Sequence, residues 1–141
     1  MSEAHARRAV ELHDSTLAAV SWHGAVAVLQ LRPAYVHRWE PSDRTTPATG
    51  WAQDVDIVIG SASVVGGTEI TRISDGSVSC GRGRWDNLLP IPLRADSGVM
   101  VHLLGVNGAT LEASGDYIEL VHRSEPRYLE VSPWDGAYLA T

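Results

Sequence analysis

The sequence predicts an all-β fold, an antiparallel β-sandwich or partly closed barrel of about nine or ten strands. Short runs of apolar residues, several of them alternating with polar ones, are separated by turn signals roughly every 8–12 residues. Only residues 2–12 are rich in helix formers, and they are expected to form a short helix or a frayed arm. Residues 9–12 could equally begin a strand.

The composition is that of one folded domain. At 141 residues the chain can bury a complete hydrophobic core, and no linker divides it. Its 44% hydrophobic and 20% charged residues exclude a disordered chain. We therefore expect a single domain over residues 1–141, in which residues 1–8 are either part of a helix or a flexible arm.

The charge balance limits the kinds of molecule that the protein is expected to bind. Arginine alone supplies the 11 basic side chains, and 17 acidic residues bring the net charge to −6. That surface disfavours nucleic acid and anionic membranes, and no apolar stretch approaches the roughly 20 residues of a membrane-spanning helix. The N-terminus lacks the apolar run of a signal peptide, and a lone Cys80 cannot form a disulfide within the chain. The sequence thus predicts a soluble cytoplasmic protein without a cofactor.

The first predicted hairpin joins residues 16–22 to residues 25–31 through a two-residue turn at His23-Gly24. In that register Val20 lies opposite Ala27. Both faces are largely apolar, so the hairpin is expected to lie centrally in a sheet that is covered on both sides.

The middle of the chain predicts further strands. Pro33 should interrupt the ladder or mark an edge, and residues 40–50 form the longest predicted loop. Residues 51–59 alternate as a strand, whereas Asp75-Gly76 predicts a hairpin that pairs Ile73 with Val78. Residues 88–93, with two prolines, predict an edge strand or an extended segment.

The last third of the chain predicts a meander with two-residue turns at Asn107-Gly108 and Gly115-Asp116, followed by a strand over residues 126–132. That register sets Glu112 opposite Glu119, an unfavourable pair of like charges. Either an arginine bridges them or the second turn is longer and the register slips. The expected core face of the meander consists of Met100, His102, Leu104, Leu111, Ala113, Ile118, Leu120 and His122.

Residues 33–39 carry the best candidate for a binding surface. If they are extended, Tyr35, His37 and Trp39 lie on one side and Arg38 lies on the other. Trp51 follows the long loop and could return to the same area. Aromatic rings beside histidine and arginine suit the recognition of a small ligand or a protein. The alternative is that these rings plug one end of the sandwich, with Arg38 in a salt bridge.

His13 and Asp14 form a second candidate pair. The His-Asp dipeptide also occurs in metal phosphohydrolases, but those are helical bundles with further ligands that this β-rich chain lacks. A turn in which Asp14 and Ser15 bond nearby backbone N–H groups is the alternative.

The remaining polar residues are not expected to form a functional site. None of the six histidines has the spacing of a known metal motif, so no metal site is expected. Asp54 and Asp56 are expected on a solvated face, and residues 81–85 in an exposed turn. Cys80, expected opposite Thr71, shows no sign of activation.

Several segments resemble a group of small uncharacterised bacterial proteins with no assigned activity. The resemblance runs through residues 12–15, 33–39, 50–53, 87–93 and 126–130, and so spans most of the chain. A shorter similarity, confined to His13-Asp14-Ser15, is to immunity proteins of bacterial toxin systems.

Three hypotheses for the function follow. The first is a binding or interaction module, expected as a homo-oligomer, that contacts a protein or a small molecule through Tyr35, His37, Arg38, Trp39 and Trp51. The second is an enzyme or ligand carrier with a pocket inside a barrel, using His13, Asp14 and His37. The third is an immunity-type inhibitor whose acidic surface speeds its encounter with a basic toxin. The sequence has no nucleophile elbow, phosphate loop or dinucleotide fingerprint, which favours a non-enzymatic role.

Overall fold

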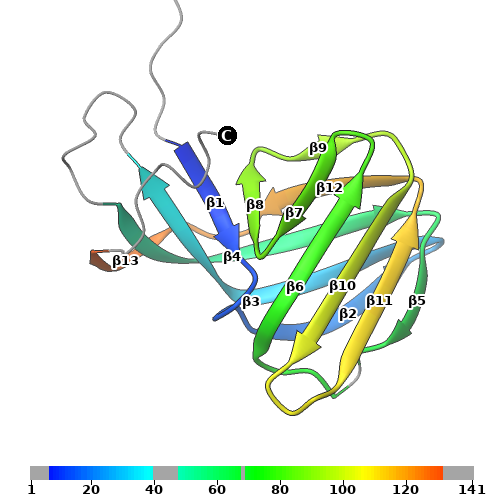
Figure 1. Cartoon of the computed structure of the whole chain (residues 1–141), viewed down its shortest axis with the longest axis horizontal. Coiled ribbons are helices and arrows are strands. Elements are labelled where there is room, and N and C mark those ends of the chain that lie inside the picture. Colours follow the sequence, from blue (N-terminus) through cyan, green and yellow to red (C-terminus); the bar gives the residue numbers. More distant parts are fainter. Residues whose placement is uncertain (1–6, 40–47, 68, 132–141) are drawn as a thin grey trace, which may run out of the picture.

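The computed structural model describes residues 7–39, 48–67 and 69–131, and over these ranges the protein is all-β and contains no helix. Two antiparallel sheets of eight and five strands pack face to face (Figure 1). The predicted fold class is confirmed. The thirteen strands exceed the expected number because four of them, β5, β7, β8 and β9, have four residues or fewer.

The larger sheet has the order β8-β1-β3-β4-β12-β9, with β2 paired to β3 and β13 paired to β4. Its strands are β1 Arg7–Glu11, β2 Leu17–His23, β3 Val26–Trp39, β4 Thr49–Gly60, β8 Leu88–Ile91, β9 Arg94–Ala95, β12 Tyr117–His122 and β13 Arg127–Val131. The smaller sheet has the order β5-β11-β10-β6-β7, with β5 Ser63–Gly66, β6 Ile73–Cys80, β7 Gly83–Asp86, β10 Val99–Gly105 and β11 Thr110–Gly115.

Two predicted edge or terminal elements are strands. Residues 9–11 belong to β1 rather than to a helix, which confirms the alternative of a strand start, and Leu12 follows the strand, while residues 1–6 lie outside the described ranges. The proline-containing β8 is an edge strand, as predicted, and β13 confirms the strand expected near residues 126–132. Of the predicted loop at residues 40–50, residues 40–47 lie outside the described ranges, and Thr49 and Gly50 already belong to β4, so the strand begins two residues earlier than predicted.

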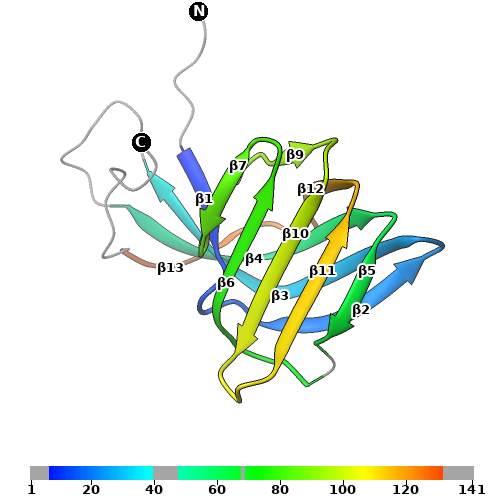
Figure 2. The same ribbon diagram turned by 45° about the vertical axis from the view of Figure 1, so that its right-hand side comes forward.

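Strand β3 runs through the centre of the larger sheet. It pairs with β4 along most of its length, with β2 along its first half and with β1 along its second half (Figure 2). Pro33 lies in the bulge between Leu31 and Ala34, where the neighbour changes. Proline cannot donate to a ladder, so the interruption is local and the strand continues to Trp39.

The β2–β3 hairpin is offset from its predicted register. Val20 pairs with Leu29 instead of Ala27, because Gly24, with a φ of 61°, and Ala25 form the turn. A shift of two residues leaves each side chain on its predicted face. Strand β2 is nevertheless mostly exposed and lies at an edge, so the prediction of a hairpin covered on both sides is wrong for β2 and right for β3.

The hairpin predicted at Asp75-Gly76 is wrong. Both residues lie inside β6, where Gly76 pairs with Leu103 of β10. A Cβ atom at Gly76 would lie 2.7 Å from Leu12 Cδ1 and 2.9 Å from Leu103 Cδ2, so the glycine permits close packing and not a turn. Cys80 consequently pairs with Gly83 rather than Thr71, and residues 81–82 form the exposed turn of the β6–β7 hairpin.

The first turn of the predicted meander is one residue longer than expected. Gly108, with a φ of 86°, donates to the carbonyl oxygen of Gly105 (3.0 Å), and Gly105 donates to that of Ala109 (2.8 Å). Leu111 therefore pairs with Leu103 instead of Leu104. A slip of one residue reverses the faces of a strand, so Val101 and Leu103 are buried while Met100, His102 and Leu104 are exposed.

The second turn does not close a hairpin. Gly115-Asp116 carries the chain from β11 in the smaller sheet to β12 in the larger one. Glu112 consequently lies opposite His102, and Glu119 lies opposite Val58 with Arg94 at 3.5 Å. Glu112 and Glu119 therefore do not face each other, and the predicted register of the meander is wrong.

Side chains from both sheets form one main core. Fully buried members include Leu29, Leu31, Ile57 and Ile59 of the larger sheet and Leu103 and Leu111 of the smaller sheet. A second, small apolar cluster of Ala9, Trp39, Ala48 and Leu88 lies at one end of the larger sheet. Within the described ranges, no helix is long and apolar enough to cross a membrane.

Candidate functional site

A polar network lies on the outer face of the larger sheet, which is the face turned away from the smaller sheet. Val10 and Val36 belong to the main core, so their alternating neighbours Glu11, Tyr35 and His37 point outward. Tyr35, His37 and Trp39 thus share one face, as the sequence predicts.

A buried contact between a histidine and a carboxylate forms the centre of this network. His37 Nε2 lies 2.6 Å from Glu11 Oε1, and the two residues are 1% and 5% exposed. Ser15 fixes the local backbone, because its hydroxyl donates to the carbonyl oxygen of Glu11 (2.6 Å) and accepts from the backbone N–H of Tyr35 (3.0 Å). Polar side chains that are buried from water normally have hydrogen-bond partners of this kind.

The network continues to the protein surface. The second carboxylate oxygen of Glu11, Oε2, lies 3.3 Å from His13 Nδ1, which lies 3.2 Å from Asp14 Oδ2. Arg72 donates to the other oxygen of Asp14 (2.6 Å). His13, Asp14 and His37 are therefore brought together by Glu11.

The predicted turn at His13-Asp14 is present, and Asp14 has a φ of 74°. The Ser15 hydroxyl accepts from a backbone N–H, as predicted, although the donor is Tyr35 on β3, whereas the Asp14 carboxylate accepts from the side chain of Arg72. Sequence analysis missed Glu11 and Arg72. The Glu-x-His-Asp spacing matches none of the motifs considered, and Arg72, which forms an isolated β-bridge with Thr16, is 58 residues away from Asp14 in the sequence.

Tyr35 extends across β4 to β13. Its hydroxyl donates to Glu130 Oε2 (2.8 Å), and its ring lies over Gly50, where any side chain would collide with it. Burial of the ring, followed by the hydrogen bond to Glu130, raises the pKa of Tyr35 above its ordinary value of 10.0.

We expect the stability of the protein to depend on Tyr35 in alkaline solution. Because the pKa of Tyr35 is higher in the folded state than in the unfolded state, its contribution is complete below about pH 10 and declines as the pH rises further. Urea unfolding between pH 8 and pH 11 should show a smaller decline in Tyr35→Phe than in the wild type. Tyr128→Phe, which alters an exposed tyrosine on β13, should keep the decline of the wild type. Equal declines in all three proteins would contradict the assignment.

The remaining predicted site residues lie on both faces of the larger sheet. Trp39 is 4% exposed and stacks on His37 with ring centroids 5.6 Å apart. Trp51 pairs with Val36 and so lies on the opposite face, where its ring contacts Tyr128 edge-on at 5.4 Å. Arg38 also lies on that face and is exposed. A role for these residues in partner binding stays a prediction, and the burial of His37 and Trp39 leaves little of either ring for a partner to touch.

Asp56 is a second buried acid that the sequence placed on a solvated face. It is 3% exposed, with Arg32 NH2 2.7 Å from Oδ1 and Arg123 Nε 2.7 Å from Oδ2. The prediction is therefore wrong for Asp56. Two arginines distant in sequence cover it, and local alternation cannot reveal them.

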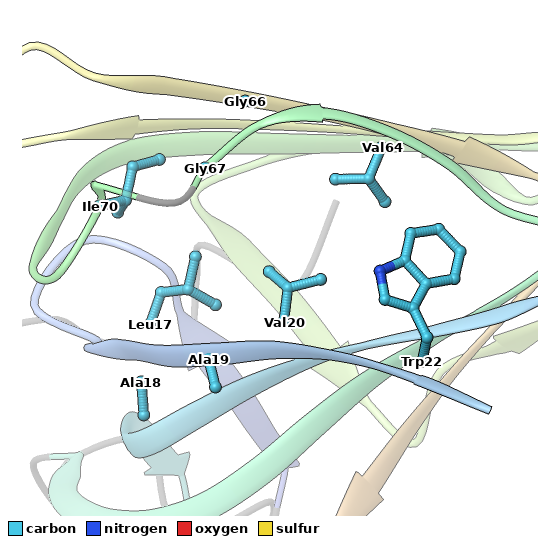
Figure 3. Close-up of a pocket in the computed structure, with 9 residues that line it drawn as sticks. All are labelled: Leu17, Ala18, Ala19, Val20, Trp22, Val64, Gly66, Gly67 and Ile70. Atoms are coloured by element: carbon cyan, nitrogen blue, oxygen red, sulfur yellow. The ribbon is translucent and has the colours of Figure 1, made fainter.

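An apolar groove of about 420 Å³ lies between the edge strands β2 and β5 of the two sheets (Figure 3). Val20 and Trp22 point from β2 toward β5, and Val64 points back toward Trp22. Trp22 is 49% exposed. The complete lining consists of Leu17, Ala18, Ala19, Val20, Trp22, Val64, Gly66, Gly67 and Ile70.

Backbone hydrogen bonds close the groove at both ends. Ala62 donates to the carbonyl oxygen of Ala25 (2.8 Å) at one end, and Leu17 donates to that of Thr71 (2.7 Å) at the other. Between these bonds, β2 and β5 each have a strand partner on one side only, as far as the described residues show. The groove is thus bordered by two sheet edges.

Strand β2 lacks the features that normally protect a sheet edge. Its seven residues include no proline and no aspartate, glutamate, lysine or arginine. Natural edge strands commonly carry such residues to prevent pairing with other chains. Sequence analysis missed the groove because it placed this uncharged strand in the middle of a sheet.

Comparisons with known proteins identify no relative. No protein-family model, curated protein or solved structure matches the chain.

Proposed function

We propose that the protein is a binding module that captures an extended apolar segment of a partner protein between β2 and β5. The observation that carries this proposal is the unprotected edge of β2 beside an apolar groove. The class of function agrees with the first hypothesis from the sequence, but the proposed surface is a different one.

The mode of recognition would be the addition of a strand. An extended peptide that pairs with a sheet edge gains main-chain hydrogen bonds, and every second side chain then faces the same way. Along β2, those side chains would enter the groove. Its volume of about 420 Å³ falls within the range of sites that enclose small ligands, about 300–1,000 Å³.

Trp22 is the expected anchor. Tryptophan is enriched among the few residues that dominate binding energy, and this one is half exposed at the groove. The edge supplies affinity without sequence preference, whereas the groove selects apolar side chains at alternate positions.

Peptide selection tests the proposal. A phage-displayed library of random eight-residue peptides is selected on the wild-type protein, and enriched peptides are synthesised for titration. We expect apolar residues at alternate positions. Trp22→Ala should weaken binding of these peptides by about thirtyfold or more, since truncating a hot-spot residue costs about 2 kcal/mol or more.

Leu129→Ala is the matched control, because Leu129 is an equally exposed apolar residue on the remote β13. This variant should bind the selected peptides as the wild type does. Absence of enrichment, or equal binding by all three proteins, would contradict the proposal.

The oligomeric state provides a second test of the same edge. Light scattering should give the same oligomeric state for the wild type and for Ala19→Lys, because the β2 edge is expected not to pair with a second copy of the chain. A dimer that Ala19→Lys converts to monomers would instead assign this edge to a second copy of the chain, which is one form that the predicted homo-oligomer could take, and would contradict capture of a foreign segment. The resemblance to uncharacterised bacterial proteins and to immunity proteins adds no observation that favours another function.

A further inference from the structure

Three potential metal ligands converge at the turn after β1, and none of the three residues lines the groove. They are Glu11 Oε2, His13 Nδ1 and Asp14 Oδ2, which all lie within 4.8 Å of one another. We propose that these three atoms form a binding site for a divalent transition-metal ion, most suitably Zn²⁺. This site is independent of the proposed capture of a peptide.

The spacing of the three atoms fits a tetrahedral ion. Zinc bonds to nitrogen and oxygen ligands are about 2.0–2.1 Å long, which sets neighbouring ligands of a tetrahedron about 3.3–3.4 Å apart. His13 Nδ1 lies 3.3 Å from Glu11 Oε2 and 3.2 Å from Asp14 Oδ2. The Glu11 and Asp14 oxygens lie within 4.8 Å of each other, and a three-ligand face requires them to come within about 3.3–3.4 Å.

Hydrogen bonding alone does not explain why two carboxylate oxygens lie close to His13 Nδ1. A single imidazole nitrogen carries at most one proton, yet two carboxylate oxygens approach His13 Nδ1 at hydrogen-bonding distance. One hydrogen bond cannot serve both oxygens with good geometry. A cation in the space between the three atoms would satisfy all of them at once.

The surrounding residues hold each carboxylate in the required orientation. Glu11 uses Oε1 to bond the buried His37 and turns Oε2 toward His13. Asp14 uses Oδ1 to accept from Arg72 and turns Oδ2 toward His13. Metal sites characteristically fix their ligands through such outer partners.

The backbone of the turn is equally well fixed. Asn87 accepts from the backbone N–H of His13 through its side-chain oxygen (2.6 Å) and from that of Leu12 through its carbonyl oxygen (2.8 Å). Asp14 donates to the carbonyl oxygen of Ile73 (3.2 Å). The ligands therefore require little ordering when an ion binds.

The ligand set indicates which ion the site would take. An imidazole with two carboxylates suits Zn²⁺ and neighbouring transition metals, whereas Mg²⁺ and Ca²⁺ favour oxygen ligands alone. The side chains of His13 and Asp14 are 50% and 34% exposed, so water can supply a fourth ligand. Three protein ligands with an open fourth position are typical of zinc sites that act on a bound molecule.

Titration calorimetry with ZnSO₄ on protein first treated with EDTA tests the site. We expect one equivalent to bind the wild type, and His13→Ala and Asp14→Asn each to bind at least about tenfold more weakly. MgCl₂ under the same conditions should give no saturable heat. Both replaced side chains are partly exposed, and circular dichroism verifies that the variants are folded.

The matched control is His102→Ala. His102 is another half-exposed histidine beside a carboxylate, with its Nε2 atom 3.9 Å from Glu112 Oε1. This variant should bind zinc as the wild type does. Absence of saturable binding to the wild type, equal binding by His13→Ala, or loss of binding in His102→Ala would overturn the proposal, and binding of Mg²⁺ with equal affinity would overturn the choice of ion.

Discussion

Replacing Asp56 with alanine should lower the free energy of unfolding by about 3 kcal/mol, the lower end of the range for breaking a buried ion pair. The carboxylate accepts from Arg32 and Arg123, one on each of its oxygens. Removing it leaves two guanidinium groups close together without their shared counter-charge. The Arg32 and Arg123 side chains are 28% and 52% exposed, so water compensates for part of the loss.

Urea denaturation of Asp56→Ala and Asp54→Ala measures this effect. Asp54 lies two residues earlier on the same face of β4 and is only partly buried. Its replacement should change the unfolding free energy by less than about 1 kcal/mol. Similar losses in the two variants would mean that Asp56 is not the centre of a specific ion-pair network.

The second large effect concerns the register of β10. Leu103→Ala should lower the unfolding free energy by about 2–5 kcal/mol, because Leu103 is fully buried and its truncation leaves a cavity. Leu104→Ala, the neighbouring substitution of the same type, should cost less than about 1 kcal/mol, because Leu104 is 39% exposed.

Thermal or urea unfolding of the two variants distinguishes the observed register from the one that the sequence predicts. With two-residue turns in the meander, Leu104 would face the core and Leu103 would not. A larger loss for Leu104→Ala than for Leu103→Ala would therefore show that the observed pairing of Leu103 with Leu111 is wrong.

The fold class could be predicted because alternation and turn residues are local properties of the chain. The same local rules failed where a glycine has a use other than a turn. Gly76 leaves room for Leu12 and Leu103 inside a strand, and Gly108 occupies the third position of a longer turn. A dipeptide alone does not distinguish these uses, since the difference depends on residues that are remote in sequence.

The candidate site could be predicted only in part, for a similar reason. Extended residues 33–39 place Tyr35 and His37 on one face, which follows from the geometry of any strand. The partner of His37 is Glu11, which the pairing of β1 with β3 brings to it from 26 residues away. Asp14 and Arg72 are likewise joined by tertiary contacts over 58 residues. No spacing rule within the sequence connects such pairs.

The chain passes from the smaller sheet to the larger sheet at Gly115-Asp116, so an insertion in one sheet need not change the pairing in the other. A residue added to the β10–β11 turn would change pairing in the smaller sheet only, because the next strand, β12, takes its register from β4 through Tyr117 and Gly60. The larger sheet, which holds His37 and Glu11, would keep its alignment. A change in the length of that turn should thus leave the polar network of the larger sheet undisturbed.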